Sequence, residues 1–426
     1  MLLFLALFAS ADAPNDATPG NYAPTTKLLT IRAAPSATSE QAGKLAEGEV
    51  FAVTAVVDGP GCRSGWGQVG TDAFTCLDFA EPAQTAPVHL PRDLVYEPPF
   101  PTDYANYSEN GVWTHRGTGE DDLLPFVYAR RWKEWRGRVY TDAAAYESGA
   151  APSSRLPAGR RARFVDAAET SLGVVLIRED GTVVPEEDVY VFPITRFQGR
   201  DLVADPLPEG HTLAWSTNYE DAPLYREPTL GEPEFRVAYH QSFVVAEEPV
   251  RDHIWRAPNA FAIGEDGYVD DRTDVRVFQR AERPEDVGTD EMWIDLEREA
   301  TVLAVYRGDT PIYVTLTSPG TGTRTPIGTW RIQDKRVWHD MQSRAGSDDP
   351  YYVEAVPWTM FFKPMYAIHG AYWHWGFGHK ASHGCINVAP RDARWLFEHA
   401  EPQLPVGWHT INADDEDLPG TLFRIR

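Results

Sequence analysis

The chain has 426 residues, and its 39 Lys and Arg against 63 Asp and Glu give a formal net charge of -24. A nucleic-acid partner needs clustered cations, so this balance argues against one. At roughly 150 residues per domain, the length predicts about three domains. Abundant aromatic residues (14 Trp, 18 Tyr, 19 Phe), with 33 Gly and 34 Pro, favour short strands joined by turns. We therefore predict a mostly β protein.

The first residues predict export. Leu2 to Ala9 form an unbroken apolar run, and Ala9-Ser10-Ala11 has the small-x-small pattern that signal peptidase recognises. We expect a signal peptide over residues 1–11. This run is too short to span a bilayer, and no later stretch has 18 consecutive apolar residues. The mature chain is expected in the periplasm or cell envelope, without a membrane span.

The cysteine count is odd, with Cys62, Cys76 and Cys385. Paired cysteines become disulfides in an oxidising compartment. Cys62 and Cys76 lie 14 residues apart in one β-like stretch and form the natural pair. Cys385 is then left as a free thiol, which is exposed to oxidation unless it is buried and inert or has a function.

Short alternating runs separated by Gly and Asp begin after residue 23 and predict a small antiparallel barrel over residues 24–82. The order of Ile31-Arg32, Pro35, Gly43-Lys44 and Gly65-Trp66-Gly67 in this region resembles the bacterial Src-homology-3-like domains that accompany cell-wall enzymes. The resemblance implies wall targeting, with simple spacing as the alternative. A segment rich in Pro and polar residues, 83–124, is expected to be a linker.

Two further β modules are expected over residues 125–198 and 208–282. Asp180-Gly181-x-Val183 with Asp188-Val189 recurs as Asp266-Gly267-x-Val269 with Asp274-Val275, at an offset of 86 residues. The second module is therefore interpreted as a possible repeat of the first. An Asp-Gly turn between alternating strands is also common in hairpins, so chance similarity is the alternative.

From Met292 the pattern changes to strong strands, with a tight Gly308-Asp309 turn that predicts a hairpin. The glycines of residues 319–330 are not followed by Gly-Lys-Ser/Thr or a helix, which argues against a phosphate loop. We expect one catalytic domain over residues 292–412 and a C-terminal tail over 413–426.

Two short motifs in this domain carry chemistry: Ala367-Ile368-His369-Gly370 and Ser382-His383-Gly384-Cys385-Ile386-Asn387. A thiol attacks only as its thiolate, so a working cysteine needs a base within hydrogen-bond reach. His383 lies two residues before Cys385 on a glycine-containing turn, where its side chain is expected to point away. His369 ends a separate apolar strand and can approach from across the site, so it is the better candidate base.

These motifs resemble the catalytic signature of the L,D-transpeptidases, penicillin-insensitive enzymes that remodel peptidoglycan. The resemblance covers about residues 292–412 and includes Thr325-Pro326-x-Gly328-x-Trp330. It implies that Cys385 is the nucleophile, that His369 is the base and that the Gly370 carbonyl orients this base. Backbone amides near His383, Gly384 and Cys385 would form the oxyanion hole. The loop between His369 and Ser382 is slightly shorter than is usual in the family. The shape of the lid over the site is therefore expected to differ from the family's, whereas the chemistry is not.

The candidate substrate-binding residues are Ser382, Asn387, Arg391, Trp373 and Tyr372. Arg391 either binds a substrate carboxylate or pairs with an acid of the protein. Trp373, Trp375 and Phe377 alternate with His374 and glycines, which favours a loop covering a site over core packing.

We expect no cofactor and no metal. His369, His374, His379 and His383 with Cys385 offer donors that zinc prefers, but their spacing matches no zinc-ligand motif.

The leading functional hypothesis is acyl transfer. Cys385 would form a thioester with a peptidoglycan tetrapeptide stem, release D-alanine and pass the stem to an amine. Water as acceptor would instead give an L,D-carboxypeptidase or endopeptidase, because the outcome depends on how a lid excludes water. A non-catalytic wall-binding protein is the third possibility. The resemblance also implies acylation by carbapenems, whereas the acceptor and the oligomeric state stay open.

Overall fold

The computed structural model describes residues 17–47, 49–87, 124–193, 195, 197–227, 232–249, 260–263, 267–270, 275–343, 350–413 and 418–426. The expected signal peptide, most of the expected linker, and Asp266 and Asp274 of the expected repeat lie outside these residues. Contacts divide the chain into two units, Met1–Pro91 with Leu404–Asn412, and Arg92–Gln403 with Ala413–Arg426.

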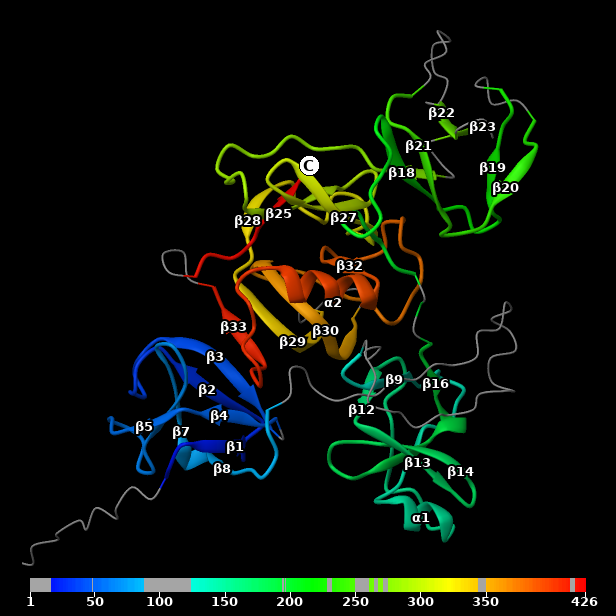
Figure 1. Ribbon diagram of the computed structural model, residues 1–426. Coiled ribbons are helices and arrows are strands. Elements are labelled where there is room, and N and C mark those ends of the chain that lie inside the picture. Colours follow the sequence, from blue (N-terminus) through cyan, green and yellow to red (C-terminus); the bar gives the residue numbers. More distant parts are fainter. Residues whose placement is uncertain are drawn as a thin grey trace, which may run out of the picture. The chain divides into compact units, whose positions relative to one another are not determined.

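The protein is mostly β, as the composition predicts (Figure 1). Its described residues include two α-helices, α1 (Ala143–Glu147) and α2 (Pro390–His399), and the short 3-10 helices η1 (Leu77–Phe79) and η3 (Glu186–Asp188). Among these residues, no helix has the length and apolar character needed to cross a membrane.

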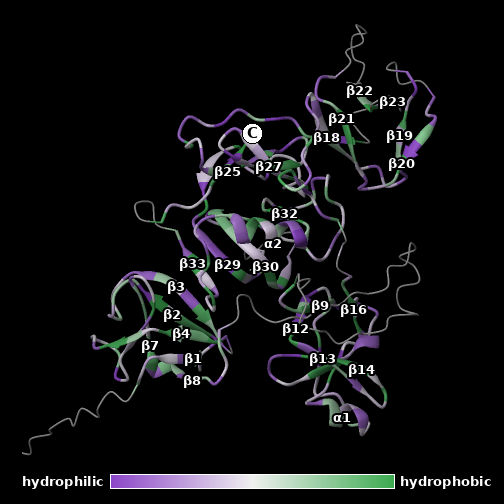
Figure 2. Cartoon of the chain, viewed as in Figure 1, coloured by the Kyte–Doolittle hydropathy of each residue, from purple (hydrophilic) through white to green (hydrophobic). Residues whose placement is uncertain are grey.

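The first unit consists of short antiparallel strands. β1 (Gly20–Pro24) pairs with β4 (Phe51–Val53) and β8 (Ala80–Pro82). β2 (Leu28–Arg32) pairs with β3 (Gln41–Ala46) and β7 (Ala73–Cys76), and β6 (Trp66–Gly70) joins β7 to β5 (Ala55–Val57). Alternation places Leu29 and Ile31 of β2 in the core, and apolar residues lie mainly on the strands (Figure 2). A disulfide joins Cys62 and Cys76 in this unit.

The second unit contains the first of the two middle modules. β9 (Val127–Arg130) pairs with β12 (Arg161–Phe164) and β16 (Tyr190–Val191), and β10 (Arg138–Val139) pairs with β11 (Ser154–Arg155). β13 (Asp166–Thr170), β14 (Gly173–Ile177) and β15 (Val183–Pro185) form a three-stranded sheet. Ala129, Phe164 and Leu176 lie in the core of this module.

The second middle module has a similar set of pairings. β18 (His211–Ser216) pairs with β21 (Ser242–Ala246) and β24 (Val275–Val277). β19 (Ala222–Leu224) pairs with β20 (Phe235–Val237), and β22 (Ala260–Ile263) pairs with β23 (Gly267–Asp270). Single bridges, Tyr140 to Val183 and Tyr225 to Tyr268, occupy corresponding places in the two modules. The pairings correspond in part, because β13, β14 and β15 form a three-stranded sheet whereas β22 and β23 form a two-stranded one.

The region expected to be catalytic, residues 292–412, is built on a long sheet. In the following order, each strand of the sheet pairs with the next: β29 (Asp334–Gln342), β30 (Tyr352–Lys363), β31 (Tyr366–Gly370), β32 (Ile386–Val388), β27 (Thr310–Ser318), β26 (Val302–Arg307), β25 (Met292–Glu297), β34 (Leu422–Ile425) and β28 (Gly328–Arg331). β17 (Arg200–Asp201) also pairs with β27. α2 packs against β30 and β31 and begins at Pro390, whose missing N–H costs nothing at the first helical position.

The C-terminal residues differ from the predicted boundaries. Residues 413–426 are not only a tail, because β34 lies between β25 and β28 and buries Leu422, Phe423 and Ile425. β33 (Thr410–Asn412) belongs to the first unit, where it pairs with β3. A short strand can join any sheet with a free edge, so its apolar pattern alone does not tell which sheet it joins.

The first middle module shares a core with the catalytic sheet. Arg161 of β12 pairs in parallel with Val353 of β30, and the Tyr128 hydroxyl donates to the Ala355 carbonyl at 2.6 Å. The Tyr128 and Tyr372 rings stack with centroids 3.7 Å apart. This contact is therefore an ordered interface rather than a flexible tether.

Candidate active site

The two sequence motifs meet on adjacent strands. β31 and β32 run parallel, and His369 pairs with Asn387. Alternate residues of an extended segment share a face, so Cys385 and Asn387 are expected on the face that His369 uses. His369, Cys385 and Asn387 indeed line one cavity of about 680 Å³.

Other residues of both motifs, and of the neighbouring module, line the same cavity. From the catalytic region they include Tyr351, Tyr352, Trp373, Ser382 and His383. The first middle module contributes Arg130, Arg160 and Arg161. The cavity thus lies at the interface that joins this module to the catalytic sheet.

The imidazole of His369 is neutral at neutral pH, and one contact fixes its tautomer. Its side chain is buried, and Nδ1 lies 3.2 Å from the carbonyl oxygen of Gly370. Burial lowers the pKa of His369 to about 4, although the hydrogen bond to Gly370 opposes this shift. With the proton on Nδ1, the lone pair of Nε2 is available to accept a proton.

Cys385 is a protonated thiol at neutral pH. The residue is partly accessible, but desolvation of the thiol raises its pKa to about 11, against a smaller opposing effect of the Ala367 backbone. A neutral thiol and a neutral imidazole therefore line the same cavity, and the Cys385 Sγ lies 3.7 Å from the Met365 carbonyl oxygen. Such a thiol becomes a nucleophile only after it loses its proton.

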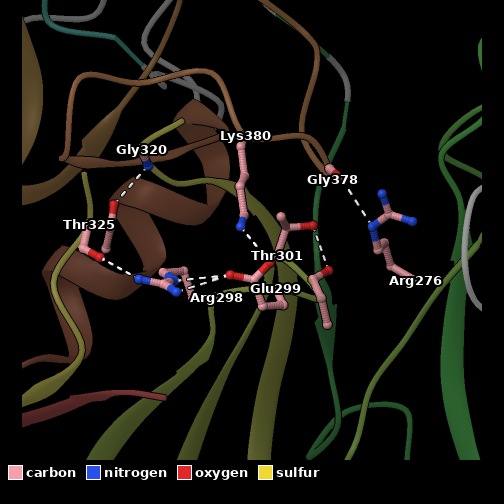
Figure 3. Close-up of polar contacts among 9 residues, drawn as sticks. Arg276, Arg298, Glu299, Thr301, Gly320, Thr325, Gly378 and Lys380 are labelled. Atoms are coloured by element: carbon pink, nitrogen blue, oxygen red, sulfur yellow. Dashed lines mark hydrogen bonds and ion pairs between the residues drawn. The ribbon is translucent and has the colours of Figure 1, made fainter. Parts of the chain in front are cut away.

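The segment before Cys385 is fixed by hydroxyl groups. Ser382 Oγ accepts from the Gly384 amide at 3.0 Å and donates to the Cys385 carbonyl. Thr325 Oγ1 donates to the Gly384 carbonyl at 2.8 Å. The same oxygen accepts from the Gly320 amide at 2.7 Å, as Figure 3 shows. Because the Gly384 amide is already engaged, it does not fit the oxyanion role expected from the resemblance.

Gly384 also has a steric reason to be glycine. Its φ is +143°, which L side chains rarely adopt, and a Cβ would lie 2.9 Å from the Tyr366 ring. This residue therefore shapes the turn that presents Cys385.

The aromatic residues after β31 have separate roles, which corrects their interpretation as one covering loop. Trp373 lines the cavity, and its ring lies 5.7 Å from that of His369. Phe377 is fully buried and stacks on Phe197 with centroids 5.8 Å apart, whereas Trp375 is 40% exposed. Core packing therefore explains Phe377, and of these three aromatic residues only Trp373 is among the lining residues of the cavity.

The second middle module anchors the same segment. Arg276 Nε donates to the Gly378 carbonyl at 3.2 Å (Figure 3), and His240 Nε2 donates to the Phe377 carbonyl at 2.9 Å. His379 Nε2 contacts the Thr217 carbonyl at 2.8 Å. On the other side, Lys380 forms an ion pair with Glu299 at 2.6 Å (Figure 3). These contacts give His240 and His379 backbone carbonyls as partners.

Two expected substrate contacts are not brought to the cavity. Tyr372 is 3% exposed and packs in the core shared with the first middle module, where its hydroxyl donates to the Glu354 carbonyl. Arg391 lies in the first turn of α2 and does not line the cavity. Tyr372 was misassigned because its polar hydroxyl is satisfied inside the protein. Asn387 does line the cavity, and its Nδ2 lies 2.9 Å from Nε2 of His374.

Sequence reasoning missed four residues that line the cavity, namely Arg130, Arg160, Arg161 and Tyr351. Arg160, Arg161 and Arg163 form a basic cluster that stands out in an acidic chain. That cluster was a usable signal. The place of Arg160 and Arg161 in the cavity lining depends on the pairing of Arg161 with Val353, which no local pattern predicts.

Comparison with known proteins agrees with this geometry. Residues 291–411 match the family model of the L,D-transpeptidase catalytic domain, YkuD. The C-terminal region of this chain therefore carries an L,D-transpeptidase catalytic domain. The probable L,D-transpeptidase YbiS of Escherichia coli K12 is 30% identical over 116 residues, which are 24% of this chain and 36% of that protein. The chain thus spans about a third of the length of this curated relative.

Solved structures with partial similarity include two L,D-transpeptidases. The Enterococcus faecium L,D-transpeptidase C442S mutant is 20% identical, with a TM-score of 0.25, over 32% of this chain and 50% of that chain. The L,D-transpeptidase from Mycobacterium smegmatis is 16% identical, with a TM-score of 0.26, over 52% of this chain and 88% of that chain.

Proposed function

We propose that this protein is a peptidoglycan L,D-transpeptidase that uses Cys385 as its nucleophile. The observation that carries the proposal is the meeting of Cys385 with the neutral base His369 in one cavity, inside a region that matches the catalytic-domain family. Neither residue would need this arrangement for a wall-binding role alone.

The chemistry follows from the two protonation states. His369 Nε2 takes the thiol proton as Cys385 Sγ bonds to the carbonyl carbon that precedes the terminal D-alanine of a tetrapeptide stem. The carbonyl oxygen becomes an oxyanion, for which the Cys385 amide is our candidate donor. The carbon–nitrogen bond then breaks, and the imidazolium returns its proton to the departing D-alanine amine.

The second half of the reaction releases the thioester. An acceptor amine attacks the carbonyl carbon, His369 takes a proton from this amine, and the thiol leaves as Cys385 is reprotonated. The product is a stem joined to the acceptor. Water in place of the amine would give the carboxypeptidase or endopeptidase outcome.

We also propose that the protein is exported and acts in the cell envelope. The Cys62–Cys76 disulfide supports an oxidising compartment, and the apolar start of the sequence supports a signal peptide. The first unit is our candidate Src-homology-3-like module, which would hold the enzyme near its polymeric substrate. The middle modules are the candidate repeat, and their contacts with the catalytic region give them a supporting role.

The test is incubation with defined muropeptides, followed by mass spectrometry of the products. We expect cross-linked dimers with equimolar D-alanine, and trimmed monomers alone would favour the hydrolase. Cys385→Ala should abolish turnover, and His369→Ala should lower kcat/KM by roughly 10²- to 10⁴-fold. His399→Ala changes an exposed histidine outside the cavity and serves as the matched control. D-alanine release by folded Cys385→Ala would contradict the proposal.

Acylation by a carbapenem gives an independent readout. A thiolate formed beside His369 attacks strained amide carbonyls, and LdtMt1, which covers 56% of this chain at 18% identity, is described in complex with imipenem. We expect a single covalent addition on the peptide that contains Cys385. An adduct on Cys62 or Cys76 would contradict both the disulfide and the assignment of the nucleophile.

A further inference from the structure

His374 lies between the two sequence motifs of the site and contacts the second of them. Its Nε2 lies 2.9 Å from the side-chain amide of Asn387. Its ring packs against Phe377, with ring centroids 4.9 Å apart, and against Trp373, with centroids 6.3 Å apart. Packing therefore holds the imidazole in place, and the position of its proton decides what the ring offers to Asn387.

One backbone contact fixes the position of this proton. The Gly376 amide donates to Nδ1 of His374 at 3.2 Å, so Nδ1 uses its lone pair and carries no hydrogen. Desolvation lowers the pKa of His374 to about 4, and the nearby His369 and Arg161 add to this shift. The imidazole is therefore neutral at neutral pH, with its one proton on Nε2. This tautomer is the opposite of that of His369, whose Nδ1 lies 3.2 Å from a carbonyl oxygen.

The Nε2–H group of His374 needs an acceptor, and the Asn387 amide has one. If Nδ2 of Asn387 faced this group, two N–H donors would point at each other over 2.9 Å. A half-turn of the amide about its bond to Cβ exchanges the oxygen and the NH2 group with almost no change in shape. His374 therefore selects the orientation in which Oδ1 of Asn387 accepts from Nε2, and the NH2 group is turned away from His374.

The second end of this amide lies on the side of the cavity. Asn387 lines the cavity together with His369 and Cys385, whereas His374 is not among the described residues that line it. Asn387 also pairs directly with His369 across β31 and β32. Within the described part of the chain, no residue forms a hydrogen bond with this second end. The Asn387 side chain is buried, and a buried donor without an acceptor is costly, so the arrangement favours a bound molecule that supplies an acceptor.

We propose that His374 is a positioning residue that turns the NH2 group of Asn387 into the cavity, where this group donates to a peptide carbonyl oxygen of the donor stem. A tetrapeptide offers such carbonyl oxygens along its backbone, and a neutral donor suits a neutral acceptor. The inference rests on the proposed function, because that function identifies the peptide. It gives this point of the cavity the character of a donor, so a ligand that presents an N–H group there is disfavoured.

The tautomer of His374 can be measured directly. Long-range 1H–15N correlation spectra of the 15N-labelled wild type at pH 7 distinguish a protonated ring nitrogen from an unprotonated one. Spectra of His374→Phe and His369→Ala assign the two sets of signals. We expect the proton on Nε2 in His374 and on Nδ1 in His369. A proton on Nδ1 of His374 would overturn the proposal, because Nε2 would then accept from the NH2 group of Asn387.

Steady-state kinetics with a tetrapeptide donor test what this orientation does. His374→Phe keeps a ring against Phe377 but loses the Nε2–H group, so the Asn387 amide is free to turn. We expect KM for the donor to rise about tenfold, with a smaller change in kcat. His374→Gln places an amide NH2 group near the position of Nε2 and should restore most of the loss. His399→Phe makes the same change at an exposed histidine outside the cavity and should keep the KM of the wild type.

A double-mutant cycle separates positioning from a general structural effect. Asn387→Leu removes the amide itself and should raise KM at least as much as His374→Phe does. If His374 acts through Asn387, the addition of His374→Phe to Asn387→Leu should cause no further rise in KM. Additive rises in KM would overturn the proposal, as would a His374→Phe variant with the KM of the wild type.

Binding without turnover separates this proposal from the catalytic one. In the Cys385→Ala background, calorimetry should show that His374→Phe weakens binding of the tetrapeptide about tenfold and that His374→Gln restores most of it. If these differences are seen while the wild type releases no D-alanine, the positioning role stands and the proposed reaction fails. If the wild type releases D-alanine while His374→Phe changes neither binding nor KM, the positioning role fails and the reaction stands.

Discussion

Nδ1 of His369 lies 3.2 Å from the carbonyl oxygen of Gly370, the next residue in the chain. A carbonyl only accepts hydrogen bonds, so this contact favours the tautomer with the proton on Nδ1. Nε2 then keeps its lone pair. The backbone of one glycine therefore does the orienting work that a third side chain does in other nucleophile–base pairs.

The protonation state of Cys385 can be tested by alkylation. Because the pKa of the thiol is raised to about 11 and that of His369 is lowered to about 4, the resting pair is neutral. The rate of reaction with iodoacetamide should therefore rise about tenfold per pH unit from pH 7 to pH 10, without a plateau. The measurement is the mass of the peptide containing Cys385 against time. A plateau below pH 8 would indicate a preformed thiolate–imidazolium pair.

The site was partly predictable from sequence because its chemistry is local. His369-Gly370 and Ser382 to Asn387 each occupy a few consecutive residues, and β31 and β32 lie side by side. Arg130 and Arg161 were not predictable, because their place in the cavity lining depends on the pairing of β12 with β30. Tyr372 shows the opposite error. Its neighbourhood in sequence suggested the site, whereas its ring completes a core with Tyr128.

The same distinction applies to the fold. Strand content and hairpins follow from alternating apolar residues and turn residues, so a mostly β chain was predictable. The strand order was not, since β34 enters between β25 and β28 from residues expected to be a tail. Pairing between distant segments depends on which strand edges remain open after the rest has folded, and this information is absent from any short window.

Gly384 should be intolerant of a side chain. Gly384→Ala would place a Cβ 2.9 Å from the Tyr366 ring at a φ of +143°. Forcing such a backbone costs about 1–3 kcal/mol, and relief by rotation would move the adjacent Cys385. We expect a kcat loss of about 100-fold, since a shift of about 1 Å in a reacting group has that effect. D-alanine release and thermal unfolding measure the two effects.

Gly322→Ala is the control for this substitution. Gly322 also has a positive φ, of +62°, but nothing lies within 4 Å of its Cβ position. Its variant should keep kcat near that of the wild type. Equal kcat values for Gly384→Ala and the wild type would show that the turn does not position Cys385.

Asp392 should make stability fall as pH rises through mild acid. Burial raises the pKa of this carboxyl to about 6, although hydrogen bonds from Thr315, Gly199 and Tyr313 oppose the shift. The folded state therefore binds its proton more tightly than the unfolded chain, whose Asp pKa is about 3.9. The stabilisation is complete below about pH 4 and is lost as pH rises to about 6.

Urea unfolding of Asp392→Asn between pH 4 and pH 7 tests this linkage. The free energy of unfolding of the wild type should fall relative to that of Asp392→Asn by up to about 1.4 kcal/mol per pH unit between pH 4 and pH 6. The exposed Asp286→Asn is the control and should show no such relative change. Parallel pH profiles for the wild type and Asp392→Asn would mean that the buried carboxyl stays ionised.

Lys335 should have the opposite dependence at alkaline pH. Its side chain is fully buried, its Nζ donates to the Ala400 carbonyl at 2.6 Å, and burial lowers its pKa to about 7 despite Glu401 and Glu398. The unfolded chain keeps a Lys pKa near 10.4, so between about pH 7 and pH 10 the unfolded state binds more protons. Stability contributed by this group is therefore fully present above about pH 10 and is lost as pH falls to about 7.

Lys335→Met removes the titration, and the free energy of unfolding of the wild type should rise relative to that of this variant by up to about 1.4 kcal/mol per pH unit from pH 7 to pH 10. Urea unfolding across this range provides the measurement, with Lys133→Met as the exposed control. If the wild type and Lys335→Met keep a constant difference in free energy of unfolding, Lys335 is charged inside the protein and its contact with Ala400 is a charge-assisted hydrogen bond.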